Sequence, residues 1–117
     1  MKQSKLNYIL DQHKLWLESN GNKGKKANLA YVNLTNANLS GTNLTGADLY
    51  CANLSYADLT NAYLSGTNLT EANLTDSILN SKWMYKTRVD HSQLSWLATD
   101  PNFCDWVDKL DVKKEAA

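Results

Sequence analysis

Four residues of the types that carry out acid, base and nucleophilic chemistry stand at equal intervals along the chain. Tyr31, Cys51, Glu71 and His91 are separated by twenty residues each. A cysteine becomes a nucleophile when a base lies within hydrogen-bonding distance. The two histidines and two cysteines of the whole chain show no metal-ligand spacing. Whether the four residues can react together depends on the elements that position them.

Leucine occupies every fifth position from Leu29 to Leu79 without interruption. The residue two places before each leucine is Ala, Val, Thr or Ser. An α-helix repeats near 3.6 residues and a strand repeats at every second residue, so a period of five gives neither element a buried face. The period therefore predicts a solenoid. Its predicted structural core is Leu29, Leu34, Leu39, Leu44, Leu49, Leu54, Leu59, Leu64, Leu69, Leu74 and Leu79.

The eleven units read ANLAY VNLTN ANLSG TNLTG ADLYC ANLSY ADLTN AYLSG TNLTE ANLTD SILNS. This pattern resembles the A(D/N)LXX repeat of the pentapeptide-repeat family. The resemblance implies an all-β solenoid, a right-handed quadrilateral β-helix in which four units form one turn. It also implies that the leucine and the small residue two places before it point inward. With three weaker units centred on Met84, Val89 and Leu94, the coil would have about three and a half turns.

A single domain is expected, with the flanking segments covering both ends of the coil. Residues 1–26 are interpreted as a capping helix and loop, because apolar residues follow helical spacing and predict a helix from Ser4 to about Asn20. Residues 27–81 are the regular repeats and 82–96 the degenerate ones. Lys82 falls in an inward slot, so the coil there is either distorted or already open. Residues 97–117 are predicted to be a C-terminal helix and tail, the helix starting around Pro101.

With four units per turn, residues twenty apart stack about 4.8 Å from one another. Glu71 then lies beside His91, whereas Cys51 is two steps or about 10 Å from that histidine, too far for activation. A convex wall also offers no pocket that excludes water. This series is therefore interpreted as surface decoration. No catalytic, cofactor-binding or metal-binding residue is predicted.

Aromatic residues give the stronger functional signal, because exposed Tyr and Trp are favoured at protein interfaces. An alternative applies to Trp83, Tyr85 and Trp96, which stand where the repeat weakens and would then be covered by the C-terminal helix. The predicted interaction surface comprises Tyr31, Tyr50, Tyr56, Tyr63, Trp83 and Trp96.

Charge argues against several classes of partner. The net charge is zero, so no overall field attracts nucleic acid or an anionic membrane. The resemblance also suggests mimicry of DNA toward DNA gyrase, the best-known activity of the family. Duplex DNA carries a charge every ~1.7 Å, so ~17 Å of coil would need roughly ten acids. The regular repeats contain four, on three different faces: Asp48, Asp58, Glu71 and Asp76.

These observations favour a non-enzymatic protein-interaction or scaffolding module that uses no cofactor. Its expected partner is another protein, without direct contact to nucleic acid or membrane, and the resemblance implies that two copies pair through the C-terminal region. The alternative is a DNA-mimicking inhibitor or protector of DNA gyrase. A cytoplasmic location is predicted, because no apolar stretch approaches the ~20 residues of a membrane span and Cys51 and Cys104 are isolated thiols.

Overall fold

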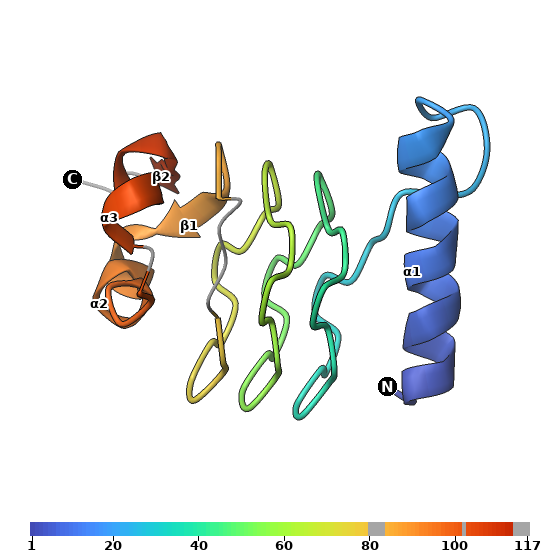
Figure 1. Ribbon diagram of the computed structural model, residues 1–117. Coiled ribbons are helices and arrows are strands. Elements are labelled where there is room, and N and C mark those ends of the chain that lie inside the picture. The colour runs from blue at the N-terminus through green and yellow to red at the C-terminus, as the bar shows by residue number, and fades with distance from the viewer. Residues whose placement is uncertain (80–83, 102, 114–117) are drawn as a thin grey trace.

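The computed structural model describes residues 1–79, 84–101 and 103–113. A coil lies between a long helix at one end and a group of short elements at the other (Figure 1). The helix is α1 (Gln3–Glu18). The short elements are β1 (Arg88–Asp90), η1 (His91–Gln93), α2 (Leu94–Leu97), α3 (Phe103–Trp106), η2 (Val107–Lys109) and β2 (Asp111–Lys113). Lys82 and Trp83 lie outside the described residues.

The coil advances by twenty residues per turn. Parallel bridges join Asn28 to Asp48 and Asp48 to Asn68. Backbone hydrogen bonds accompany them, with the N–H of Leu29 donating to the C=O of Asp48 at 2.8 Å and the N–H of Leu49 to the C=O of Asn68 at 2.9 Å. Four five-residue units therefore form one turn, and this prediction is confirmed.

The interior of the coil is a stack of leucines. All eleven repeat leucines are buried, with exposed fractions between 0% and 6%. Thr67 and Thr87 occupy the small-residue slot and are also buried. Their hydroxyls donate to the C=O groups of Leu44 (2.7 Å) and Leu64 (2.5 Å). A buried hydroxyl is costly unless it is hydrogen-bonded, so these two threonines fit the core because the preceding turn supplies acceptors.

Asparagine side chains stabilise the outer side of each turn. The Oδ1 of Asn33 accepts hydrogen bonds from the backbone N–H (3.0 Å) and the hydroxyl (2.6 Å) of Thr35. The same arrangement recurs at Asn53 with Ser55 and at Asn73 with Thr75. Asn tolerates turns because its side chain can bond to the backbone two residues later. The polar residues that follow the repeat are thus part of the scaffold.

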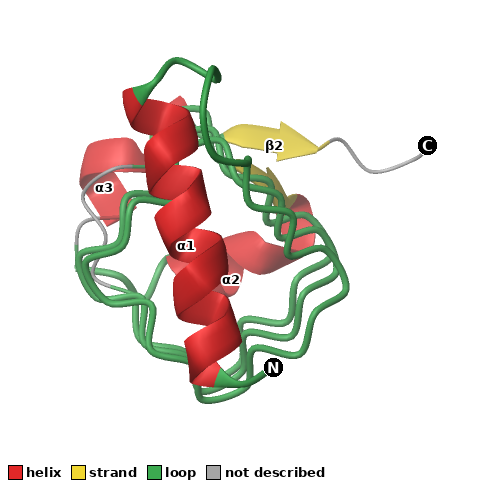
Figure 2. Ribbon diagram, turned by 90° about the vertical axis from the view of Figure 1, so that its right-hand side faces the viewer, coloured by secondary structure: helices red, strands yellow, loops and turns green. Residues whose placement is uncertain are grey.

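Helix α1 lies across the open N-terminal end of the coil (Figure 2). Its His13 is fully buried and joins two backbone groups of the first turn. Nδ1 accepts from the N–H of Ala27 at 3.0 Å, and Nε2 donates to the C=O of Thr45 at 3.0 Å. The ring also stacks on Trp16 with 5.6 Å between centroids. The predicted N-terminal helix is present and lies over the first turn, with His13 as a polar link.

The C-terminal end differs from the prediction in two places. Met84 and Val89 are buried and keep the repeat phase, but Leu94 begins α2 and does not centre a further unit. The predicted single C-terminal helix is instead α3 and η2, followed by β2, which pairs in parallel with β1. Arg88 reinforces this pairing through an ion pair with Asp111 at 3.5 Å.

Gln93 explains why the coil stops. In the preceding turn the N–H of Asn73 donates to the C=O of Ala52. One turn later the C=O of Ala72 accepts instead from the side-chain Nε2 of Gln93 at 3.0 Å, and the same amide donates to Leu69 at 2.7 Å. The side chain thus replaces the backbone N–H that another strand would supply, which leaves the main chain free to enter α2.

We predict that Leu54→Asp and Leu59→Asp each abolish folding, whereas Asn61→Asp is tolerated. A buried carboxylate without a partner costs several kcal/mol, which is comparable to the whole stability of a small domain. Asn61 is exposed at a corner with a φ of 59°, a conformation that Asp also adopts. Urea unfolding followed by circular dichroism measures the difference. Equal stability of the three variants would contradict the inward assignment.

We predict that deletion of residues 1–20 causes self-association. The truncation exposes the first leucine layer and leaves the N–H of Ala27 and the C=O of Thr45 without His13, and an open edge is a template for pairing. Multi-angle light scattering should show dimers or larger species. A monomeric, soluble truncated protein would rule out the capping role of α1.

We predict that stability decreases as the pH falls below about 6.5. Burial lowers the pKa of His13 from 6.5, the hydrogen bond to Thr45 opposes this effect, and the charge of Lys26 adds to it. The unfolded chain therefore binds the proton first, so stability is lost below the unfolded pKa until the folded protein is protonated as well. Urea unfolding at several pH values should show a steeper loss for the natural protein than for His13→Gln, which retains the background titration of the carboxylates.

Candidate functional site

The predicted aromatic surface divides into separate groups. Tyr31, Tyr56 and Tyr63 have exposed fractions of 72%, 59% and 41%, and Tyr50 is half-buried. Trp83 lies outside the described residues. Tyr31 and Tyr56 stand at corners of the coil, where φ is 64° and 60°. Because corner side chains are attached to a backbone fixed by its neighbouring turns, the rings are presented in defined positions.

Tyr31 and Tyr50 form the most ordered part of this surface. Their rings meet edge to face, with 5.5 Å between centroids and 84° between planes. The N–H of Tyr31 donates to the C=O of Tyr50 at 2.8 Å, so the two residues belong to adjacent turns. A hydrogen bond with Cys51 is the main effect that raises the pKa of Tyr50 above 10.0. A tyrosine with its ordinary pKa of about 10 is already neutral at neutral pH, so this upward shift leaves Tyr50 a neutral hydrogen-bonding group.

Tyr63 lies on a different wall. Its bridge partner in the preceding turn is Asn43. Tyr31 and Tyr50 belong to a different wall, on which Asn28 is bridged to Asp48. Tyr85, which the predicted set omits, is exposed in the following turn, where its C=O accepts from the N–H of Gly66. The Nζ of Lys86 is 5.4 Å from the Tyr85 ring centroid. The aromatic residues therefore do not form one continuous surface.

Trp96 stands forty residues, or two turns, after Tyr56, which would place both in one column, but Trp96 is not part of the coil. It lies in α2, is half-buried and packs against the core. Together with residues 72–75, Ser92 and Gln93 it lines a hollow of about 240 Å³. The spacing rule fails here because the coil ends before residue 96. Trp96 is therefore not freely exposed, but it belongs to α2 itself and packs against the core, whereas Tyr85, which the covering alternative included, is exposed.

Ile78 is an exposed apolar residue that the predicted site omits. It occupies the position directly before the leucine, which is Asn, Asp or Tyr in the other regular units. Its bridge partner is Asp58. The departure from polar residues at this outward position was the sequence signal that could have identified it.

The series of potentially reactive residues is only partly aligned. Tyr31, Cys51 and Glu71 occupy corners with φ between 57° and 64°. Cys51 is half-buried and not in a disulfide, and His91 begins η1 after the last strand of the coil. The backbone N–H of Glu71 donates a hydrogen bond to the side-chain carboxylate of Asp90. Within residues 1–79, 84–101 and 103–113, no three His, Cys, Asp or Glu residues gather as a metal site would require.

The acidic residues of the coil are separated. Asp48 bridges Asn28 and Asn68, whereas Asp58 bridges Asn38 and Ile78, so the two carboxylates belong to different columns. Hydrogen bonds from the hydroxyl and backbone N–H of Thr60 lower the pKa of Asp58 below 3.8. This carboxylate is charged at neutral pH, but it accepts a hydrogen bond that stabilises the turn of its own backbone. A phosphate-like row of charges is therefore not formed by these two residues.

Comparison with known proteins identifies the class of this repeat. Residues 27–66 and 57–81 match the profile of pentapeptide repeats, in 8 copies. The chain belongs to the pentapeptide-repeat family, which implies a right-handed β-helix. None of the curated proteins matches it. In the part of the chain that is described, no helix has the length and apolar character needed to cross a membrane.

Three solved structures are similar to the chain. A pentapeptide repeat protein from the cyanobacterium Cyanothece 51142 is 44% identical over 48% of this chain and 43% of its own, with a TM-score of 0.44. HetL from Nostoc sp. strain PCC 7120, a protein involved in regulation of heterocyst differentiation, is 36% identical over 51% of this chain and 29% of its own, with a TM-score of 0.48. The alr5209 protein from Nostoc PCC 7120 is 22% identical over 88% and 93%, with a TM-score of 0.46. The chain spans less than half the length of the first two.

Proposed function

We propose that this protein is a small non-enzymatic module that binds another protein through the outer walls of a right-handed quadrilateral coil of about three turns. The observation that carries the proposal is the Tyr31 and Tyr50 pair, held edge to face on two adjacent turns. Aromatic rings that are already ordered lose little conformational entropy on binding and bury a large area.

The mechanism is steric and adhesive and requires no cofactor. Tyr50, like any tyrosine with a pKa of about 10 or above, is neutral at neutral pH, and such a hydroxyl donates and accepts hydrogen bonds at an interface rim. We propose that Cys51, which is half-buried and not in a disulfide, packs beside this pair and does not attack a substrate. We further propose that the protein acts in the cytoplasm, without direct contact to nucleic acid or membrane, and that two copies can pair through the C-terminal elements.

Mimicry of DNA toward DNA gyrase is the second candidate. A DNA mimic needs a dense row of negative charge, since duplex DNA carries one charge per ~1.7 Å. The regular repeats hold four acids. Asp48 and Asp58 are in different columns, and the carboxylate of Asp58 is engaged by Thr60. The distribution of charge therefore favours the interaction module.

We predict that the double variant Tyr31→Ser, Tyr50→Ser loses its protein partner while the fold is kept. Anchor residues of this kind contribute about 2 kcal/mol or more each, or about 4 kcal/mol for the pair, so binding should weaken roughly 1000-fold. The immobilised protein would capture the partner from an extract of the source cell, and quantitative binding to the purified partner would follow. Tyr63→Ser, Tyr85→Ser is the matched control, because both residues are exposed tyrosines on a wall that does not carry the pair. Equal loss in both variants would contradict the assigned surface.

Sedimentation with purified DNA gyrase separates the two candidates. The module proposal expects the protein to sediment independently of the enzyme. Co-sedimentation that is lost in Asp48→Asn, Asp58→Asn would replace it with the mimicry mechanism.

A further inference from the structure

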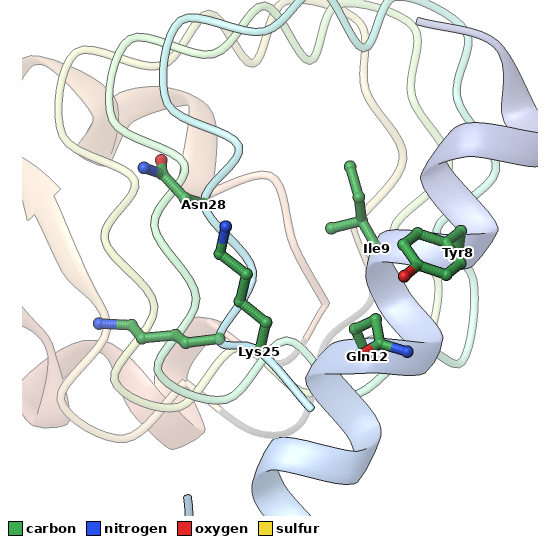
Figure 3. Close-up of a pocket in the computed structure, with 6 residues that line it drawn as sticks. Tyr8, Ile9, Gln12, Lys25 and Asn28 are labelled. Carbon is green, nitrogen blue, oxygen red and sulfur yellow. The ribbon is translucent and has the colours of Figure 1, made fainter. Parts of the chain in front are cut away.

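A hollow of about 330 Å³ lies where α1 faces the linker and the first repeat (Figure 3). Helix α1 contributes Tyr8, Ile9 and Gln12, and the opposite side is formed by Lys25, Lys26 and Asn28. Figure 3 labels Tyr8, Ile9 and Gln12 on the helix and Lys25 and Asn28 on the chain segment opposite it. Pockets for small ligands begin at about 300 Å³. The hollow therefore has the volume of a small-molecule site and is separate from the tyrosine pair.

The hollow carries positive charge that the protein does not neutralise. Of the residues described, the ion-paired cations are Lys14 with Glu18 and Arg88 with Asp111, so Lys25 and Lys26 are left without a carboxylate partner. Both lysines are exposed, and the charge of Lys26 contributes to lowering the pKa of the buried His13 ring. An anion bound in the hollow would offset the positive charge of the two lysines.

The walls of the hollow are fixed before any ligand arrives. The N–H of Lys25 donates to the C=O of Gln12 at 3.1 Å, which ties the linker to the helix. Gly24 allows this approach: its φ is +69°, and a Cβ there would lie 2.3 Å from the Gln12 oxygen. The Oδ1 of Asn28 accepts from the N–H of Ala30 at 3.2 Å, so its Nδ2 remains a donor. Preorganised donors lower the entropic cost of binding.

We propose that this hollow binds a small organic dianion, represented by a phosphate monoester. Lys25 and Lys26 neutralise the two charges, and the amides of Gln12 and Asn28 donate to its oxygens. Ile9 and the ring of Tyr8 contact the carbon part of the molecule. This site acts independently of the proposed protein-binding surface, so either can fail without the other. Because the ligand joins the linker to α1, its binding also strengthens the N-terminal cap.

The test is a titration of the full chain with phenyl phosphate, followed by nuclear magnetic resonance at constant ionic strength. Saturable shifts centred on residues 8–12 and 25–28 are expected. Inorganic phosphate should bind at the same residues but more weakly, because it lacks the carbon part. Shifts of equal size at all exposed lysines, or shifts that never saturate, would overturn the proposal.

Two variants test the assigned groups. Lys25→Gln, Lys26→Gln should weaken phenyl phosphate at least ~10-fold, whereas Lys2→Gln, Lys5→Gln changes the net charge equally outside the hollow and should leave binding unchanged. Asn28→Asp places a negative charge in the hollow and should also abolish binding. The variant should keep the local turn, because the carboxylate of Asp48 accepts the equivalent hydrogen bond, from the N–H of Tyr50, one turn of the coil later. Equal weakening by the two lysine pairs would show that binding follows net charge alone and would overturn the site.

Discussion

The parallel hydrogen bonds between successive turns are the interaction on which the structure depends. Each turn bonds through its backbone to the turn that follows, as in the bond from the N–H of Leu29 to the C=O of Asp48. This ladder requires that every unit present the same geometry, and it leaves a set of unpaired groups at each end of the coil. Side chains satisfy some of these groups. His13 does so at the first turn, and Gln93 and Asp90 do so at the last.

The same ladder separates the scaffold from the positions that are available for function. The leucines and the small residues fill the interior, and the Asn side chains are occupied in turns. Binding must therefore use the remaining outward positions, chiefly corners such as Tyr31 and Tyr56, and the junction where α1 meets the linker. These two regions have different chemistry, since one is aromatic and neutral and the other is basic and hollow. The residues that could distinguish this protein from other regular solenoids therefore lie at the corners and at the end of the coil, where the repeat does not fix the residue type.

Sequence periodicity predicted the repeated part of the fold well. Leu29 to Leu79 are buried as expected, and the turn of four units was available from the family resemblance. The candidate surface was predicted less well. The Tyr31 and Tyr50 contact follows from the register, but Trp96 was misplaced because the twenty-residue rule was extended beyond Val89, where the coil ends. The basic hollow was not predicted, since it joins residues of α1 to residues of the linker that have no periodic relation.

The amino-acid sequence by itself determined the inward and outward faces of the coil, because a residue in a repeat makes the same contacts in every turn and its environment can be read from its phase. Only the tertiary structure decided how the coil ends. At both ends, the groups that bond to the terminal turn come from segments outside the five-residue repeat. Whether the coil continues depends on whether a backbone N–H or a side-chain donor bonds to the last free carbonyl groups. Gln93 is an example: its side-chain amide donates a hydrogen bond to the C=O of Ala72, and the main chain continues directly into α2.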